Sequence, residues 1–144
     1  MLREVQQSGQ PATPEQQQVL ARWSGWGAIP HIFDPARKEW EAERAELRSL
    51  VSDEDYAAAR RTTLNAHYTD AGLVQAMWEG MRELGFAGGN ILEPGCGSGH
   101  FIGFAPQEMA MHWVGVELDP TTAAIATHLH PQAVILNDSF ADTV

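Results

Sequence analysis

The sequence predicts an α/β protein in which helices come first and a small parallel sheet follows. Between residues 90 and 140, short apolar segments of strand type alternate with a glycine turn and a capped helix, the order expected for one half of a parallel α/β sheet. Before residue 85, apolar residues recur at helical spacing among charged ones. A chain of 144 residues, 44% of them hydrophobic, can bury a core but forms at most about one domain.

The first 65 residues are expected to divide into a leader and a helical segment. Residues 1–20 are predicted to be a flexible leader, because this stretch is rich in Gln and is interrupted by Gly and Pro. Residues 21–65 then form an N-terminal helical segment. Within it, Asp34 and Pro35 predict the start of a charged helix that continues to residue 51. This helix is expected to be a solvated face or a docking surface for the rest of a longer protein.

Two further helices are predicted between residues 52 and 85. Ser52 caps the first, which ends near Asn65 and has acids in its first turn and arginines in its last. Thr69 or Asp70 caps the second, which stops at Gly85. The apolar residues of this second helix share one face, which must pack on something apolar: Leu73, Val74, Met77, Trp78, Met81 and Leu84.

Residues 66–144 are expected to form a partial α/β domain. Its predicted strands are 91–93, 113–118 and 133–136, with a helix over 121–129 between the last two. In an open parallel sheet, ligands bind beyond the carboxyl ends of the strands. The residues that follow each strand are therefore the candidate binding site.

Each of these strand ends carries residues suited to binding a nucleoside. The first leads into a Gly-x-Gly-x-Gly loop at 95–99, whose backbone can approach a ligand closely, and the absence of Gly at position 100 excludes the dinucleotide fingerprint. The second ends at Glu117, placed to accept hydrogen bonds from two ribose hydroxyls. The third ends at Asp138 and Phe140, which offer an acceptor for an adenine amino group and an apolar face for its ring. The sequence therefore predicts an adenosine pocket.

Several segments resemble one enzyme family. ILEPGCGSGHF (91–101), VGVELDP (114–120) and NDSF (137–140) resemble motifs I, II and III of S-adenosylmethionine-dependent methyltransferases, closest to the N6-adenine DNA enzymes. NAHYTD (65–70) resembles the segment that precedes motif I in that family, with Asp where a Pro is usual. WSGWGAIPHIFDP (23–35) resembles the front of large methylase-helicase proteins of phages and mobile elements. The resemblance covers about residues 20–144.

The resemblance implies a partial Rossmann-like sheet of the class I methyltransferases, its first three strands, with S-adenosyl-L-methionine as the cofactor. The residues it assigns to the methionine end are Tyr68, Thr69, Glu93, Gly95 and Phe101. It assigns the ribose to Glu117 and the adenine to Leu118, Asp138 and Phe140. The cofactor-binding loop is completed by Cys96, Gly97 and Gly99.

The resemblance implies no catalytic residue within this chain. In the family, an Asn/Asp-Pro-Pro-aromatic motif after the fourth strand aligns a flipped adenine for methyl transfer. The 144 residues contain no Pro-Pro pair. The chain is therefore expected to be the cofactor-binding portion of a DNA methyltransferase, weak in binding and inactive alone, which the remainder of a longer polypeptide or a complementing chain completes.

Composition limits the expected partners. A net charge of −10 and a pI near 4.9 leave no basic groove, so DNA is expected to be held by the complete protein and not by this chain. The open edge of the first strand favours self-association. One Cys and the lack of an apolar stretch of about 20 residues predict a cytoplasmic location and no membrane partner.

Other interpretations stay open. The chain could be a noncatalytic methyltransferase-like interaction or antirestriction module, or part of a methyltransferase that acts on RNA, protein or a small molecule. The six His residues share no ligand spacing, so no metal site is expected. Cys96 is expected to fill the tight loop and not to act as a nucleophile. Trp23 and Trp26 are expected to pack against the sheet domain in preference to stacking on a base.

Overall fold

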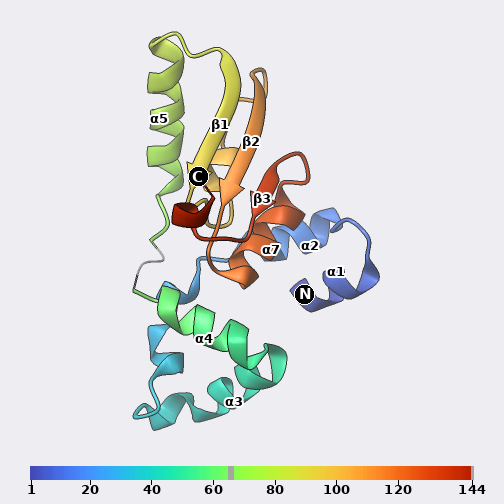
Figure 1. The fold of residues 1–144 in the computed structure, drawn as a ribbon, viewed down its shortest axis with the longest axis vertical. Coiled ribbons are helices and arrows are strands. Elements are labelled where there is room, and N and C mark those ends of the chain that lie inside the picture. The colour runs from blue at the N-terminus through green and yellow to red at the C-terminus, as the bar shows by residue number, and fades with distance from the viewer. Residues whose placement is uncertain (65–66, 144) are drawn as a thin grey trace.

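The structure is a computed structural model that describes residues 1–64 and 67–143. It has mixed α/β architecture, with a three-stranded parallel sheet and helices around it (Figure 1). The strands are β1 (Gly88–Pro94), β2 (Ala110–Val116) and β3 (Val134–Leu136), in the order β1-β2-β3. Both pairings are parallel, with Pro94 opposite Val116 and Val116 opposite Leu136. The predicted α/β class, with helices ahead of three parallel strands, is confirmed.

The helices of the sheet region begin at the predicted caps. Helix α5 (Ala71–Glu83) starts after Asp70, whose side chain accepts the N–H of Gly72 at 2.9 Å. Helix α7 (Pro120–Leu129) starts after Asp119, with Pro120 in its first position. A single helical turn, α6 (His100–Gly103), follows the glycine loop. Acidic caps and an N-terminal Pro favour these starts because they satisfy or remove the free N–H groups of the first turn.

Only two of the six apolar residues predicted to share a face of α5 are buried, which differs from the expectation that this face packs. Val74 and Trp78 are buried with Ile102 and Trp113 in one core cluster. Three of the others on the same helix, Leu73, Met77 and Met81, stay exposed, and so does Leu84, the residue that follows the helix. Among the described residues β1 is the edge strand of the sheet, so no further strand lies beside it to cover the rest of this face.

Two short helices occupy the region where a flexible leader was expected. Helices α1 (Leu2–Ser8) and α2 (Pro14–Leu20) pack through Val5 and Leu20 against Ile125 of α7. A capping box between Thr13 and Gln16 begins α2. The expectation failed because Gln is a good helix former and a Pro at the first helical position starts a helix instead of breaking one.

The charged helix begins later than its sequence suggested. Three 3₁₀ turns, η1 (Trp26–Ala28), η2 (Pro30–Phe33) and η3 (Lys38–Trp40), precede α3 (Glu41–Leu50). The predicted start at Pro35 is therefore wrong. The Arg44 guanidinium donates hydrogen bonds to the carbonyl oxygens of Ile32, Asp34 and Arg37. A helix would need the same carbonyl oxygens as acceptors for its own N–H groups, so these bonds stabilise an irregular backbone conformation instead.

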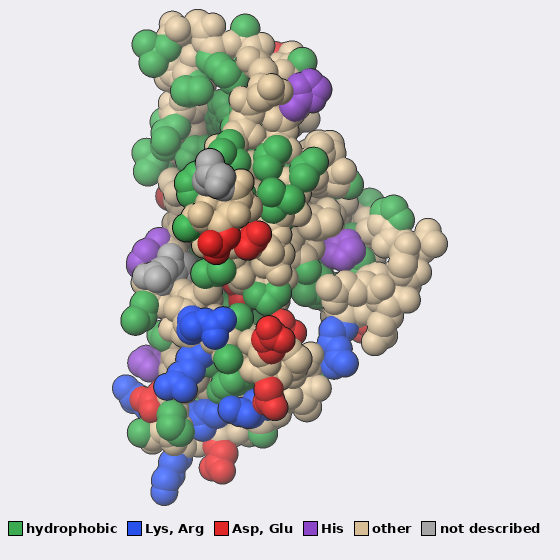
Figure 2. Space-filling model, in the orientation of Figure 1, with side chains coloured by type: hydrophobic (Ala, Val, Ile, Leu, Met, Phe, Trp, Pro, Cys, Tyr) green, Lys and Arg blue, Asp and Glu red, His purple; other side chains and the backbone are tan. Residues whose placement is uncertain are grey.

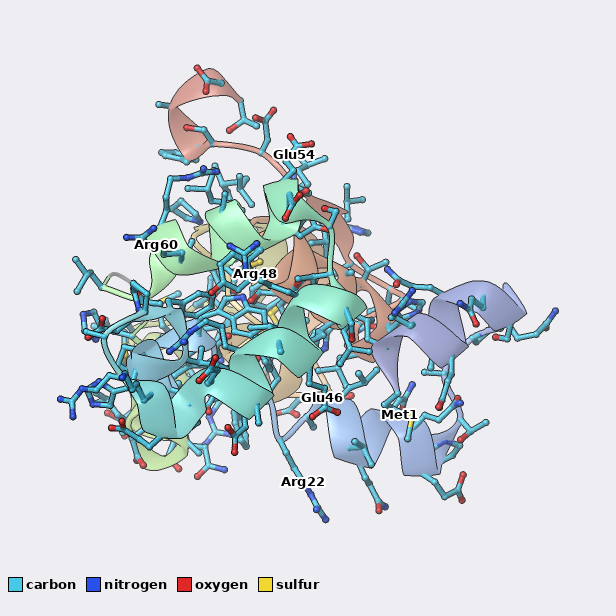
Figure 3. The ribbon with its side chains drawn as sticks, turned by 90° about the horizontal axis from the view of Figure 1, so that it is seen from below. Met1, Arg22, Glu46, Arg48, Glu54 and Arg60 are labelled. Atoms are coloured by element: carbon cyan, nitrogen blue, oxygen red, sulfur yellow. The ribbon has the colours of Figure 1, made fainter. Side chains whose placement is uncertain are left out.

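Helix α4 (Asp53–Thr62) is capped by Ser52 as predicted, and it ends three residues short of Asn65, which lies outside the described residues. Figure 3 shows Arg48 between α3 and α4, where its guanidinium lies 4.2 Å from the centre of the Tyr56 ring, whereas Arg22 points away from the molecule. Figure 2 shows Lys and Arg side chains gathered over the part of the surface formed by α3 and α4.

The carboxyl ends of β1 and β2, drawn as arrowheads, point toward α4 (Figure 1).

A last 3₁₀ turn, η4 (Phe140–Asp142), follows β3. Across residues 1–64 and 67–143, no helix has both the length and the apolar character needed to cross a membrane.

Candidate functional site

A cavity of about 830 Å³ lies at the carboxyl ends of the strands. It is bounded by the loops after β1, β2 and β3, by the segment before α5, and by residues of α4 and η1. Among its lining residues are all but one of those predicted from the sequence: Tyr68, Thr69, Glu93, Gly95, Cys96, Gly97, Phe101, Glu117, Leu118, Asp138 and Phe140. The prediction that three strand ends meet at one site is confirmed.

Backbone hydrogen bonds hold the three loops in one row. The N–H groups of Gly95 and Cys96 both donate to the carbonyl oxygen of Val116, at 2.8 and 3.0 Å. Beyond β2, the Glu117 N–H donates to the Leu136 carbonyl at 2.9 Å, and the Asp138 N–H donates to the Glu117 carbonyl at 3.2 Å. The ladder of the sheet thus continues into the loops, which fixes the spacing of the side chains they carry.

Gly99 is the predicted site residue that does not line the cavity. Its φ of +84° is a left-handed conformation, and a Cβ at this position would collide with the imidazole ring of His130. His130 is buried, and its Nε2 lies 3.0 Å from the Ser98 carbonyl oxygen. Gly99 therefore allows the loop to pack against His130, and the structure places it behind the cavity lining and not in it.

The carboxylate of Glu117 is held in place by two backbone groups. The Asp119 N–H donates to Oε1 at 2.8 Å, and the Gly97 N–H donates to Oε2 at 2.9 Å. Burial raises the pKa of Glu117, while these hydrogen bonds oppose the shift because they favour the ionised form. Each oxygen keeps a second lone pair, so the carboxylate remains able to accept bonds from a ligand in the cavity.

Two polar atoms of the cavity wall are buried without a hydrogen-bond partner among the described residues. They are Oε2 of Glu93 and the hydroxyl oxygen of Tyr68. Burial raises the pKa of Glu93 to about 7 and also raises the pKa of Tyr68. Because buried polar groups in folded proteins are nearly always paired, two such atoms in one cavity indicate a place where water or a polar ligand completes the bonding.

The segment before α5 is tied to the glycine loop through aromatic contacts. The Tyr68 ring lies 5.2 Å from that of His100, whose Nδ1 is 3.2 Å from the Thr69 carbonyl oxygen. A Cβ on Gly97, where φ is +58°, would touch the Tyr68 ring at 3.5 Å. Tyr68 thus lies over the loop, so close that even a single carbon atom added to Gly97 would be in van der Waals contact with its ring.

Cys96 is a packing residue of this loop. Its side chain is buried, and burial together with the charges of Glu93 and Glu117 raises the pKa of the thiol to about 12. A nucleophilic cysteine needs a lowered pKa, so this environment excludes that role, as the sequence suggested. The space for the thiol comes from Gly115 on β2, where an added Cβ would lie 2.8 Å from Sγ.

The end of the cavity near β3 is open. Leu118, Asp138 and Phe140 are exposed there. The Asp138 carboxylate accepts the N–H of Ser139 at 2.7 Å, so it also shapes its own loop. Asn137 donates through its side-chain amide to the carbonyl oxygens of Glu117 and Leu118, at 2.9 and 3.2 Å. This open rim offers apolar surface and one carboxylate to a flat, partly exposed ring.

The sequence pattern indicates no site role for Asp119 and predicts Trp26 to be a packing residue. The Trp26 indole N–H lies 3.2 Å from each oxygen of the buried Asp119 carboxylate, and both residues line the cavity. The Trp23 indole N–H donates to Thr122 Oγ1 at 2.9 Å. The predicted packing against the sheet domain is confirmed for Trp23, which lies against the cluster of Ile125, whereas Trp26 packs within the N-terminal segment and contacts Asp119 through its N–H. The partner carboxylate had no local sequence signal, since 93 residues separate it from Trp26.

The lining is acidic. It contains four carboxylates, those of Glu93, Glu117, Asp119 and Asp138, and, within the described part of the chain, one guanidinium, that of Arg61. Such a wall favours a cationic ligand over one that carries phosphates. No model of a known protein family matches the chain, and no curated protein matches it.

Proposed function

We propose that this chain is the cofactor-binding portion of an S-adenosylmethionine-dependent methyltransferase that acts on the N6 group of adenine in DNA. The observation that carries the proposal is the cavity at three parallel strand ends, where the fixed carboxylate of Glu117, just after β2, lines the same space as two buried polar atoms without a partner among the described residues. In this proposal the sheet is the first part of a Rossmann-like class I methyltransferase fold.

The charge of the lining supports this cofactor over a phosphorylated nucleotide. S-adenosylmethionine carries a sulfonium and an ammonium and no phosphate, and it supplies an electrophilic methyl group when bound. The carboxylates of Glu93 and Glu117 lie in the wall of the cavity. In a partly buried site, opposite charges attract more strongly than in water, and phosphates would be repelled to a similar degree.

The roles of single residues follow from their surroundings. Glu93 has a free oxygen for the ligand's ammonium, and a bound cation would return its carboxyl to the ionised form at neutral pH. Glu117 is oriented to accept hydrogen bonds from ribose hydroxyls. Leu118 and Phe140 offer apolar surface at the open rim for the adenine ring, and Asp138 offers an acceptor for its amino group.

The choice of methyl acceptor rests on the sequence resemblance alone. Motifs I to III concern the cofactor, and the resemblance to N6-adenine enzymes and to methylase-helicase proteins adds DNA adenine as the acceptor. Because the Asn/Asp-Pro-Pro-aromatic motif does not occur in these 144 residues, we expect no transfer of radiolabelled methyl groups to adenine-containing DNA by the purified chain. Transfer by this chain would contradict that part of the proposal.

Calorimetry with S-adenosylhomocysteine tests the binding proposal. We expect saturable binding by the 144-residue chain, weakened about tenfold or more by Glu117→Ala, since a lost hydrogen bond to a charged group costs about 1.5–3 kcal/mol. Glu46→Ala is the matched control, because Glu46 is an exposed residue of α3 that does not line the cavity. Equal binding of adenosine triphosphate, or a folded sample that binds nothing, would refute the proposal; the latter would favour a noncatalytic interaction module.

A further inference from the structure

A buried hydrogen-bond network connects the N-terminal segment to the cavity. Its centre is Asp119, whose side chain is 2% exposed. The Trp26 indole N–H donates to both oxygens of this carboxylate, with Nε1 3.2 Å from Oδ1 and from Oδ2. Thr122 adds two donors to Oδ2, its N–H at 2.8 Å and its hydroxyl at 2.6 Å. A buried carboxylate is stable only when donors surround it, so these groups together hold Asp119 in one position.

The same residue determines how Glu117 points. The backbone N–H of Asp119 donates to Glu117 Oε1, and the Gly97 N–H donates to Oε2. The side chain of Asp119 is therefore fixed by Trp26 and Thr122, and its backbone in turn fixes Glu117. Two hydrogen bonds therefore connect the Trp26 indole to Glu117, a residue that lines the cavity.

Trp26 is itself held by a rigid cluster. It packs edge to face with Trp23 and with Phe33, at ring distances of 4.7 and 5.7 Å, and Tyr56 of α4 completes the group. The Trp23 indole N–H donates to Thr122, which strengthens the same network from a second side. Because Trp26 is held by these contacts, its indole N–H holds the Asp119 carboxylate in a fixed position.

We propose that Trp26 is a positioning residue for ribose recognition: its indole N–H holds Asp119 so that the Asp119 backbone orients Glu117 toward the two ribose hydroxyls. This inference rests on the proposed function, because it takes the ligand's ribose to bind Glu117. It assigns to the Trp-rich segment a part in nucleoside specificity in addition to packing.

The test compares S-adenosylhomocysteine with its 2′-deoxyribose analogue. In the unaltered chain we expect the ribose form to bind about tenfold more tightly, the value of one hydrogen bond to a charged acceptor. Trp26→Phe keeps an aromatic side chain, smaller than the indole, but removes the N–H donor, and we expect it to reduce this preference to about threefold or less. Trp40→Phe is the matched control: Trp40 packs on the same cluster without lining the cavity, and we expect the preference to stay about tenfold.

A merely structural Trp26 would weaken both ligands by the same factor, and an unchanged preference in Trp26→Phe would therefore overturn the inference. Failure of the unaltered chain to bind either ligand would instead contradict the proposed function. If Trp26→Phe does not fold, the indole N–H resonance of Trp26 in the unaltered chain gives the answer. We expect its shift on binding to be larger with the ribose ligand than with the deoxy analogue, and equal shifts would refute the coupling.

Discussion

Replacing Glu93 by Gln should stabilise the protein at alkaline pH and weaken its binding of a cationic ligand. Glu93 is a partly exposed carboxyl at the end of β1 whose Oε2 has no partner among the described residues. Burial raises its pKa from 4.5 to about 7. A carboxyl with a raised pKa prefers to be protonated in the folded state, so ionising it opposes folding.

The sign and size of the effect follow from linkage. Because the folded state holds the Glu93 proton more tightly than the unfolded state does, stability falls as pH rises from about 4.5 to about 7 and is then constant. The full shift of the Glu93 pKa corresponds to about 3 kcal/mol of unfolding free energy. Screening by solvent at this partly exposed side chain reduces that to about 2 kcal/mol. Glu93→Gln removes the penalty, so its gain should be near zero below pH 4.5 and about 2 kcal/mol at pH 8.

Urea unfolding of Glu93→Gln and of the unaltered chain at several pH values between 4.5 and 8 measures this difference. Glu46→Gln on the exposed face of α3 is the control and should change the free energy of unfolding by less than about 0.5 kcal/mol at each pH. A Glu93→Gln variant that is equally or less stable at pH 8 would show that the protein itself satisfies this carboxylate. Under the proposed function, the same variant should also bind S-adenosylhomocysteine more weakly.

Two more predictions concern the interior of the glycine loop. Gly115→Ala should lower the free energy of unfolding in urea by about 1–3 kcal/mol, because the new Cβ would lie 2.8 Å from Cys96 Sγ and 3.0 Å from Ile135. Adding Cys96→Ala to that variant should restore part of the loss, and a Gly115→Ala variant as stable as the unaltered chain would contradict this packing. The buried Cys96 thiol, whose pKa is raised to about 12, should react with a disulfide reagent at least about 100-fold more slowly in the native chain than in denaturant, and comparable rates would show that the loop is open.

The elements that the sequence predicted well are those governed by local chemistry. Asp70, Asp119 and Ser52 cap their helices through their own side chains, so each start could be placed from the residue and its neighbours. The strands were located by short apolar segments between turn residues, and their parallel pairing followed from the helix between β2 and β3. Parallel pairing then brought Glu93, Glu117 and Asp138 to one end of the sheet.

Contacts between distant residues account for the differences. Arg44 donates to carbonyl oxygens 7 to 12 residues earlier and so delays the start of α3, an effect that no cap signal near Pro35 reveals. Gly99 belongs to the glycine pattern that predicted the cavity, yet His130 decides its role from 31 residues away. Periodicity marked the apolar face of α5, but the number of strands beside it determined how much of that face is covered.

The polar groups of the cavity fall into two kinds, and the difference separates orientation from binding. Glu117 and Asp119 have their hydrogen bonds supplied by the protein, so they cost little stability and hold a fixed direction. Glu93 and Tyr68 have buried atoms that the described residues leave unpaired, at a cost of about 1–3 kcal/mol each. A ligand that completes those bonds regains this energy in addition to its own contacts. Affinity should therefore depend most on the ligand group that meets Glu93 and Tyr68, and specificity on the group that meets Glu117.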